Sequence, residues 1–293
     1  MSFYAVIKKN ARVALKGRWG TATGVFALVF GVSVFLAGVE QMALRMFVAS
    51  PFYGESTADY TYFLRAFFPA GPAEIIITGI TLLLSLLILA PLLLGVTRWF
   101  YVLIQREDVV FSEIFHFFES LRRYCNSIWY AVQISARTFG WGIIFLSLPG
   151  SVMGICAYFL RIENLDRQAR AAASVGVMLA AGLLLLAALL YTVYIKKYTL
   201  AAYLLCESDD ISVRQAFRTS IKYTKGYRSI KFMFSLSFIG WYLLSPLTLF
   251  LLLFFVIPYQ SAGETVFARY LVEKNRYQEP QITREFGGAI SGR

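Results

Sequence analysis

Long stretches that are almost free of charged residues recur along this chain and constrain its fold more than any other feature. They cover residues 21–39, 75–104, 139–160, 171–195 and 232–257. Each is about as long as, or longer than, the roughly 20 residues that an α-helix needs to cross the hydrocarbon core of a bilayer. Only 15% of the chain is charged and 58% is hydrophobic, whereas about a quarter of a soluble domain is charged. The sequence therefore predicts an all-α, polytopic membrane helical bundle that forms a single integral membrane domain over residues 1–293.

The last apolar stretch decides how many times the chain crosses the membrane. Ser245 and Pro246 lie near its middle, and a proline disfavours helix at the residue before it. Residues 232–271 therefore form either one long span or a hairpin of two, and the proline favours the hairpin. The hairpin gives about six transmembrane helices and places both termini in the cytoplasm. It also puts most of the 28 lysines and arginines on the inner side, as the positive-inside rule requires.

Three segments at the inner side have the pattern of amphipathic helices. Residues 1–19 form a basic N-terminal helix, residues 105–125 carry aromatic side chains at helical spacing, and a third helix follows Ser212. Ser212 and Gln215 have the spacing of a capping box. Basic amphipathic helices bind anionic membrane surfaces. We therefore expect anionic lipid headgroups to contact Lys8, Lys9, Arg12 and Lys16 of the first helix and Arg214, Arg218, Lys222 and Lys225 of the third. On the third helix Val213, Phe217 and Ile221 fall on another arc, which is expected to face the bundle or acyl chains.

Two arginines approach the inner leaflet from neighbouring spans. Arg98 lies near the inner end of the second span, and Arg137 stands just before the third. Two interpretations are open. The arginines form a shared inner-leaflet pocket for an anion or a phosphate headgroup, or each extends separately toward the headgroups. We favour the second interpretation.

The segments outside the spans have compositions of their own. Residues 40–72 form the one long loop and hold many aromatic residues, so we expect this loop to be partly ordered against the bundle. Lys196 and Lys197 are expected to mark the exit of the fourth span, whose helix continues to residue 205. The polar tail, residues 273–293, is expected to be disordered and cytoplasmic.

The sequence offers little for catalysis. It holds one histidine, His116, and a histidine-based metal site needs further ligands. No nucleotide-binding or hydrolase motif is present. We therefore expect no enzymatic activity, no metal and no cofactor. The net charge of +11 is explained by membrane topology rather than by nucleic acid. The expected partners are membrane lipids with anionic headgroups, and a second copy of the chain or another membrane protein is a further candidate.

Two functions fit this pattern. The first is a non-enzymatic lipid-interacting or scaffold protein, indicated by the basic amphipathic segments at the inner side. The alternative is a transporter, exporter or accessory transport subunit for an apolar or amphiphilic solute. It is motivated by Pro91, Pro149 and Pro258 within apolar stretches, since prolines kink transmembrane helices.

Two segments resemble a known family. One is Leu-Lys-Gly-Arg-Trp-Gly at residues 15–20. The other runs from residue 202 through the basic helix and includes Ser-Phe-Ile-Gly-Trp at 237–241, Ile-Pro-Tyr at 257–259 and Phe-Ala-Arg-Tyr at 267–270. Together they resemble the bacterial membrane proteins known as domain of unknown function nine-seven-five. The resemblance is clearest over the last third of the chain and the first twenty residues. It implies a multi-pass fold in the bacterial cytoplasmic membrane and brings no catalytic or binding residue.

Overall fold

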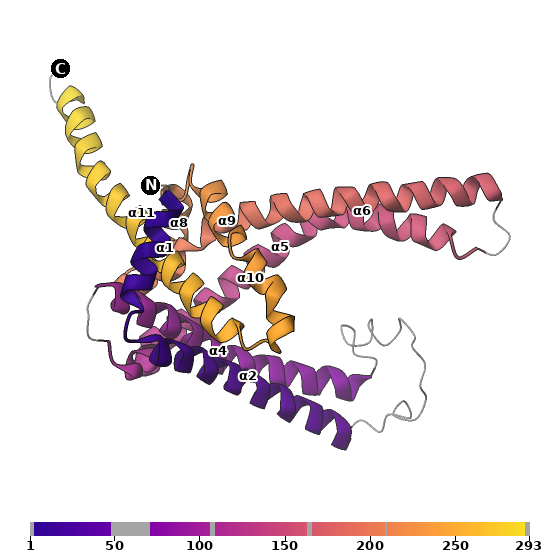
Figure 1. Ribbon diagram of the computed structural model, residues 1–293, viewed down its shortest axis with the longest axis horizontal. Helices are drawn as coiled ribbons and strands as arrows, with labels where there is room; N and C mark the ends of the chain where they lie inside the picture. The colour runs from indigo at the N-terminus through magenta and orange to yellow at the C-terminus, as the bar shows by residue number, and fades with distance from the viewer. Residues whose placement is uncertain (1–2, 48–70, 106–108, 163–165, 209, 291–293) are drawn as a thin grey trace.

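The computed structural model describes residues 3–47, 71–105, 109–162, 166–208 and 210–290, with side chains through residue 276. Every regular element in these ranges is a helix, which confirms the all-α fold class. Two long helical hairpins extend from a packed assembly of shorter helices (Figure 1). Five helical segments of the described chain are long and apolar enough to cross a membrane, as expected for a membrane protein.

The two hairpins are called the arms here. The first arm consists of α2 (Trp19–Phe47) and α4 (Pro72–Gln105), and the second consists of α5 (Leu121–Phe159) and α6 (Arg167–Ile195). Both arms extend in the same direction, and their far ends lie apart (Figure 1). The ends of α2 and α5 and the starts of α4 and α6 are therefore at the far side of the molecule.

Helices α5 and α6 pack on each other and expose most of their remaining surface. Gly176 of α6 lies against Cys156 of α5, and a Cβ atom added at Gly176 would come within 2.7 Å of the Cys156 sulfur. The small residue therefore allows the two helices to approach closely. Few residues of the two helices are buried: Ser127, Pro149, Ala173 and Ala180.

The packed assembly at the other end of the arms is called the head. It consists of α1 (Phe3–Ala14), α7 (Leu200–Glu207), α8 (Val213–Tyr223), α9 (Arg228–Leu236) and the described side chains of α11 (Leu253–Ile290). Its core is rich in aromatic residues. The largest fully buried members are Phe217, Phe234, Phe238 and Phe267.

Helix α1 lies beside the first part of α11 at the head, and the last part of α11 extends away from it (Figure 1). The ring of Phe3 packs edge-on against Phe267 and Tyr270 of α11, with centroids 5.9 and 5.2 Å apart. Aromatic pairs of this geometry add stability beyond their buried area. Helix α1 is thus part of the head rather than a separate helix on its surface.

The segment between the two arms differs from the predicted amphipathic helix over residues 105–125. The structure has instead a 3₁₀ helix, η2 (Phe111–Phe118), and α5 begins directly after it. A Cβ atom added at Gly95 of α4 would lie 1.8 Å from the carbonyl oxygen of Ile114. Because Gly95 has no side chain, the backbone of η2 docks against α4 and buries Ile114. This docking explains why the segment does not form one long surface helix.

The last apolar stretch forms a hairpin, but the chain reverses later than predicted. Helix α9 is followed by α10 (Ile239–Leu244) and the 3₁₀ helix η4 (Ser245–Thr248). Leu249 and Phe250 then adopt left-handed φ angles of 49° and 64°, and the chain turns back into α11. Pro246 lies in the first turn of η4, where a missing N–H removes no helical hydrogen bond. The proline therefore begins a helix instead of ending one.

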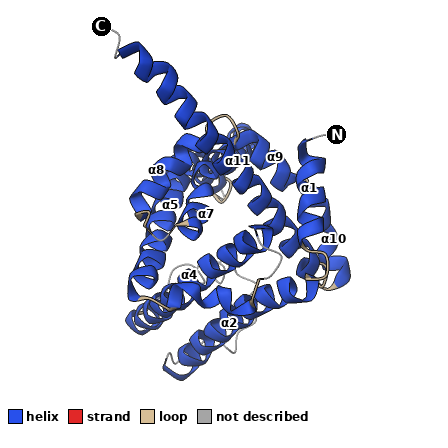
Figure 2. Ribbon diagram, turned by 90° about the vertical axis from the view of Figure 1, so that its left-hand side faces the viewer, coloured by secondary structure: helices blue, strands red, loops and turns tan. Residues whose placement is uncertain are grey.

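Helix α11 accounts for two further differences from the sequence-based expectations. About six spans were predicted, and the sixth corresponds to the first half of α11. This helix is not among the segments that are long and apolar enough, because Gln260, Glu264 and Arg269 interrupt its apolar residues. The tail from residue 273 was predicted to be disordered, but the backbone continues as helix to Ile290. Figure 2 shows this end of α11 projecting beyond the head.

The fourth span continues beyond the lysine pair, as predicted. The 3₁₀ helix η3 (Lys196–Tyr198) joins α6 to α7, and the helical segment ends at Glu207. For the predicted loop over residues 40–72, residues 40–47 belong to α2. Residues 48–70 lie outside the described residues, so the expected order of the loop stays a prediction.

Candidate functional site

Helix α8 has the two faces that its sequence predicts. The hydroxyl oxygen of Ser212 accepts a hydrogen bond of 3.3 Å from the backbone N–H of Gln215, which caps the helix. Val213 and Phe217 are buried in the core of the head. Ile221, predicted on the same face, is 37% exposed. The predicted basic residues are all exposed: Arg214, Arg218, Lys222 and Lys225.

The buried face of α8 is held by the chain itself. The hydroxyl of Ser220 donates a 2.7 Å hydrogen bond to the backbone carbonyl of Lys197 in η3. The ring of Phe217 stacks on Tyr130 of α5 with centroids 5.5 Å apart. The apolar arc is therefore turned toward the bundle, and the basic arc is on the exposed side of the helix.

Helix α1 is built in the same way. Ile7 and Ala11 are buried, and the hydroxyl of Tyr259 in α11 donates a 3.2 Å hydrogen bond to the carbonyl of Lys8. The ammonium of Lys8 lies 4.8 Å from the centre of the Phe238 ring, a cation–π contact. Lys8 is thus half-buried and partly used by the head, whereas the other three predicted lipid contacts of this segment are exposed: Lys9, Arg12 and Lys16.

Arg98 and Arg137 lie in different surroundings. Arg98 donates from Nε to the carboxylate of Glu113 at 3.1 Å and from Nη1 to the carbonyl of Cys206 at 2.9 Å. The guanidinium of Arg137 lies 4.0 Å from the centre of the Phe217 ring. The structure therefore gives Arg98 an acidic partner from η2 and covers Arg137 with α8.

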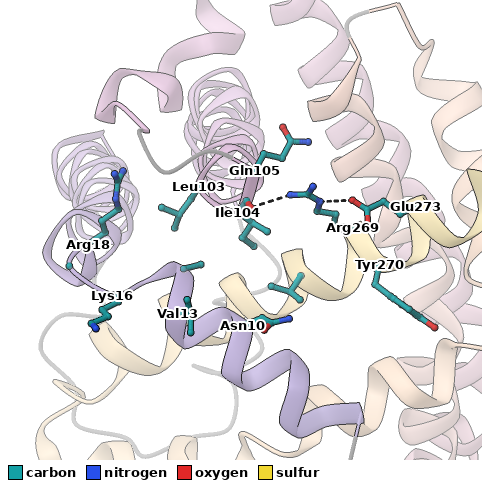
Figure 3. Close-up of a pocket in the computed structure, with 13 residues that line it drawn as sticks. Asn10, Val13, Lys16, Arg18, Leu103, Ile104, Gln105, Arg269, Tyr270 and Glu273 are labelled. Carbon is teal, nitrogen blue, oxygen red and sulfur yellow. Dashed lines mark hydrogen bonds and ion pairs between the residues drawn. The ribbon is translucent and has the colours of Figure 1, made fainter.

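A pocket of about 1160 Å³ opens at the head between the end of α1, the end of α4 and the middle of α11 (Figure 3). Arg269 of α11 crosses it. Its Nε lies 2.7 Å from the Glu273 carboxylate, and its Nη1 donates to the carbonyl of Ile104 at 3.1 Å. Other side chains that line the pocket are Asn10, Val13, Lys16, Arg18, Leu103, Gln105, Val266 and Tyr270.

The sequence pointed to this pocket only through Lys16. Arg18 and Arg269 were missed because they are separated by most of the chain and share no helical face. The available signal was Arg269 itself, a cation between apolar residues at positions 266–268 and 271–272. Only the packing of α11 on α1 and α4 brings these cations around one space.

A second polar cluster is buried deeper in the head. Lys231 in α9 is buried, with 3% of the residue exposed. Its ammonium lies 3.7 Å from the carboxylate of Glu264 in α11. Gln260 donates to the same carboxylate at 3.2 Å and Ser235 at 3.4 Å, and Lys196 donates to Ser235 at 3.2 Å. Buried charges require such partners, so this network connects η3, α9 and α11.

The lysine pair predicted to mark the exit of the fourth span lies in η3, where the second arm meets the head. Lys197 is buried, and its ammonium lies 3.4 Å from the centre of the Tyr194 ring and 4.5 Å from that of Trp141. The pair therefore has a structural role in joining the second arm to the head. Hydropathy alone did not indicate this, because a lysine at a span boundary is also the pattern of an orientation signal.

Comparison with known proteins gives a family but no activity. No curated protein and no solved structure matches the chain. The model of the family described as Protein of unknown function (DUF975) matches residues 2–275. The match includes the arms as well as the two segments that carry the resemblance in the sequence. This chain therefore belongs to the DUF975 family, the domain of unknown function nine-seven-five.

Proposed function

We propose that the protein is a non-enzymatic integral membrane protein that binds anionic lipid headgroups at its head, with both termini in the cytoplasm of a bacterial cell. The observation that carries the proposal is the orientation of α8. Its apolar residues Val213 and Phe217 are used by the core, while its four basic side chains are exposed. Basic residues near an anionic leaflet contribute about 1 kcal/mol each to membrane attraction.

The position of this face relative to the arms supports the same proposal. The arms supply the apolar surface that a bilayer covers, and the head lies at one end of both (Figure 1). Basic side chains at the end of transmembrane helices are at the depth of lipid phosphates. The exposed apolar surface of α5 and α6 also leaves room for a second copy or another membrane protein, as a scaffold requires.

The proposal is tested by reconstituting the protein in phosphatidylcholine vesicles that hold a small fraction of pyrene-labelled phosphatidylglycerol. Energy transfer from tryptophan measures the enrichment of this lipid around the protein. The variant R214Q/R218Q/K222Q/K225Q keeps good helix formers and should lower the enrichment. The difference should shrink at high salt, because screening already weakens the attraction. Equal enrichment around the variant and the parent contradicts the proposal.

A control variant with three charges removed separates the head from the far end of the second arm. The variant R161Q/R167Q/R170Q, called the tip variant, removes positive charges that lie at this far end. Lipid enrichment should change less in the tip variant than in the α8 variant. A larger loss of lipid enrichment in the tip variant would place the lipid contacts at the far end of the second arm and contradict the proposal.

Transport of an amphiphilic solute is the second candidate, and one observation favours it. The helical segment from α9 to η4 ends at a reversal of the chain at Leu249 and Phe250, and its buried Lys231 pairs with the half-buried Glu264 of α11. Broken helices and buried charges are common where transporters bind their substrates. Efflux of a fluorescent amphiphile from proteoliposomes, lost on E264Q but not in the α8 variant, supports transport over lipid binding alone.

A further inference from the structure

The pocket at the head lies at the depth where two candidate spans begin and end. Helix α2 begins at Trp19, directly after the pocket residues Lys16 and Arg18, and α4 ends at the pocket residue Gln105. Both helices are long and apolar enough to cross a membrane. Tryptophan and arginine at such boundaries lie among lipid headgroups. The pocket therefore opens where phosphates of a bilayer are found.

The lining of the pocket is complementary to an anionic amphiphile. Lys16, Arg18 and Arg269 bring cations from two separate parts of the chain, and among the described residues of the lining Glu273 is the one that carries a carboxylate. Glu273 is already paired with Nε of Arg269. The apolar part of the lining comes from Val13, Ala14, Leu103, Ile104 and Val266. A phosphate and the first carbons of a lipid need both kinds of surface.

Arg269 is oriented for a phosphate. Glu273 holds its Nε and the carbonyl of Ile104 accepts from its Nη1, so the guanidinium plane is fixed across the pocket (Figure 3). Within the described chain Nη2 makes no hydrogen bond, and it remains for a ligand oxygen. A pre-oriented guanidinium loses less entropy on binding a phosphate than a mobile lysine does.

We propose that this pocket holds the phosphate of one anionic phospholipid, such as phosphatidylglycerol, with its glycerol backbone against the apolar lining. The inference rests on the proposed function and deepens it, because it assigns one bound lipid to one site instead of a general attraction to the basic surface. The volume of about 1160 Å³ is sufficient, since ligand pockets measure about 300–1,000 Å³.

The test is a titration of delipidated protein in neutral detergent with phosphatidylglycerol, followed by native mass spectrometry. The wild-type protein should retain one lipid more tightly than all others. The variant K16Q/R18Q/R269Q should bind this first lipid about tenfold more weakly or worse, given three charges near one phosphate. The tip variant, which loses the same number of charges, should keep it.

A second variant addresses the chance that loss of Arg269 disturbs the fold. Val13 lines the pocket from α1 and is exposed, so V13W fills the space without a change in charge. It should also lose the tightly bound lipid. Unchanged affinity for the first lipid in V13W, or equal weakening in the pocket and tip variants, overturns the inference and leaves the proposed function standing.

Two further measurements identify the ligand. Inorganic phosphate at millimolar concentration should not displace the tightly bound lipid, and displacement would assign the pocket to a soluble phosphate compound instead. Phosphatidylcholine, which has a phosphate but no net charge, should bind at least about tenfold more weakly than phosphatidylglycerol. Equal affinity of the wild-type protein for the two lipids contradicts the proposed function as well as the pocket.

Discussion

The second arm and the head bury their apolar side chains to very different extents. On the arm, Leu148 of α5 and Leu185 of α6 are 73% and 69% exposed. In the head, Phe234 and Phe267 are fully buried, and even the charged Lys231 is enclosed. Yet both regions are built from sequences that are rich in leucine, phenylalanine and alanine.

The difference shows that this chain relies on two environments. The arm packs mainly as a pair of helices and needs lipid to cover its outer surface, because lipid tails are as apolar as leucine. The head packs like the interior of a soluble domain, in which changes in volume or hydrogen bonding are costly. Substitutions should therefore have different effects in the two regions, and the following predictions use this contrast.

The largest effect is expected for G95A. The new Cβ atom would lie 1.8 Å from the carbonyl oxygen of Ile114, so η2 must move away from α4. We expect a loss of about 4 kcal/mol or more in the free energy of unfolding, measured by SDS titration in mixed micelles. G182A on the second arm is the control, since no atom lies within 4 Å of its added Cβ. A neutral G95A disproves the tight docking of η2.

A smaller loss is expected for E264Q, because it leaves the buried ammonium of Lys231 without its carboxylate. Removing one partner of a buried ion pair costs about 3–5 kcal/mol, and we expect the lower end because the introduced amide keeps a polar contact. The double variant K231M/E264L should recover most of this loss. The control E119Q affects an exposed pair with Arg123 and should cost less than about 1 kcal/mol. An E264Q as mild as E119Q argues against the buried pair.

The contrast between these sites also explains what the sequence could predict. The spans and the capped basic helix were predictable, because hydropathy and the spacing of Ser212 and Gln215 are local signals. The pair Lys231–Glu264 and the cations around Arg269 depend on how α9, α11 and α1 pack. No local period encodes that packing. The docking of η2 on Gly95 could not be predicted either, since one glycine in an apolar helix does not indicate which backbone lies against it.

A moderate effect is expected for S220A in the head. Its buried hydroxyl donates to the carbonyl of Lys197, and loss of one hydrogen bond costs about 1 kcal/mol. S174A on the second arm should be close to neutral, because the hydrogen bond that Ser174 donates to Ala171 of its own helix is solvent-exposed in the isolated chain. The same SDS titration compares the two. Equal losses would remove the distinction between head and arm.

The smallest effect is expected for L185A. Leu185 is exposed on α6, and lipid surrounds it in both the folded and the inserted, unpacked state. The free energy of unfolding should change by less than about 0.5 kcal/mol. A loss above about 2 kcal/mol, the range of buried leucines, would show that Leu185 packs against a second protein molecule. That result would sharpen the comparison by identifying which part of the arm is an interface.

The most direct test of whether the arm lies in lipid and the basic face of α8 in water is a comparison of two spin labels in proteoliposomes. One label is placed at Leu185 on the arm and the other at Lys222 on α8, in a chain whose native cysteines are replaced by alanine. Collision with oxygen reports apolar surroundings, and collision with a water-soluble nickel chelate reports water. We predict high oxygen and low nickel accessibility at position 185 and the reverse at position 222. High nickel accessibility at position 185 would contradict the account, because the arm would then be in water.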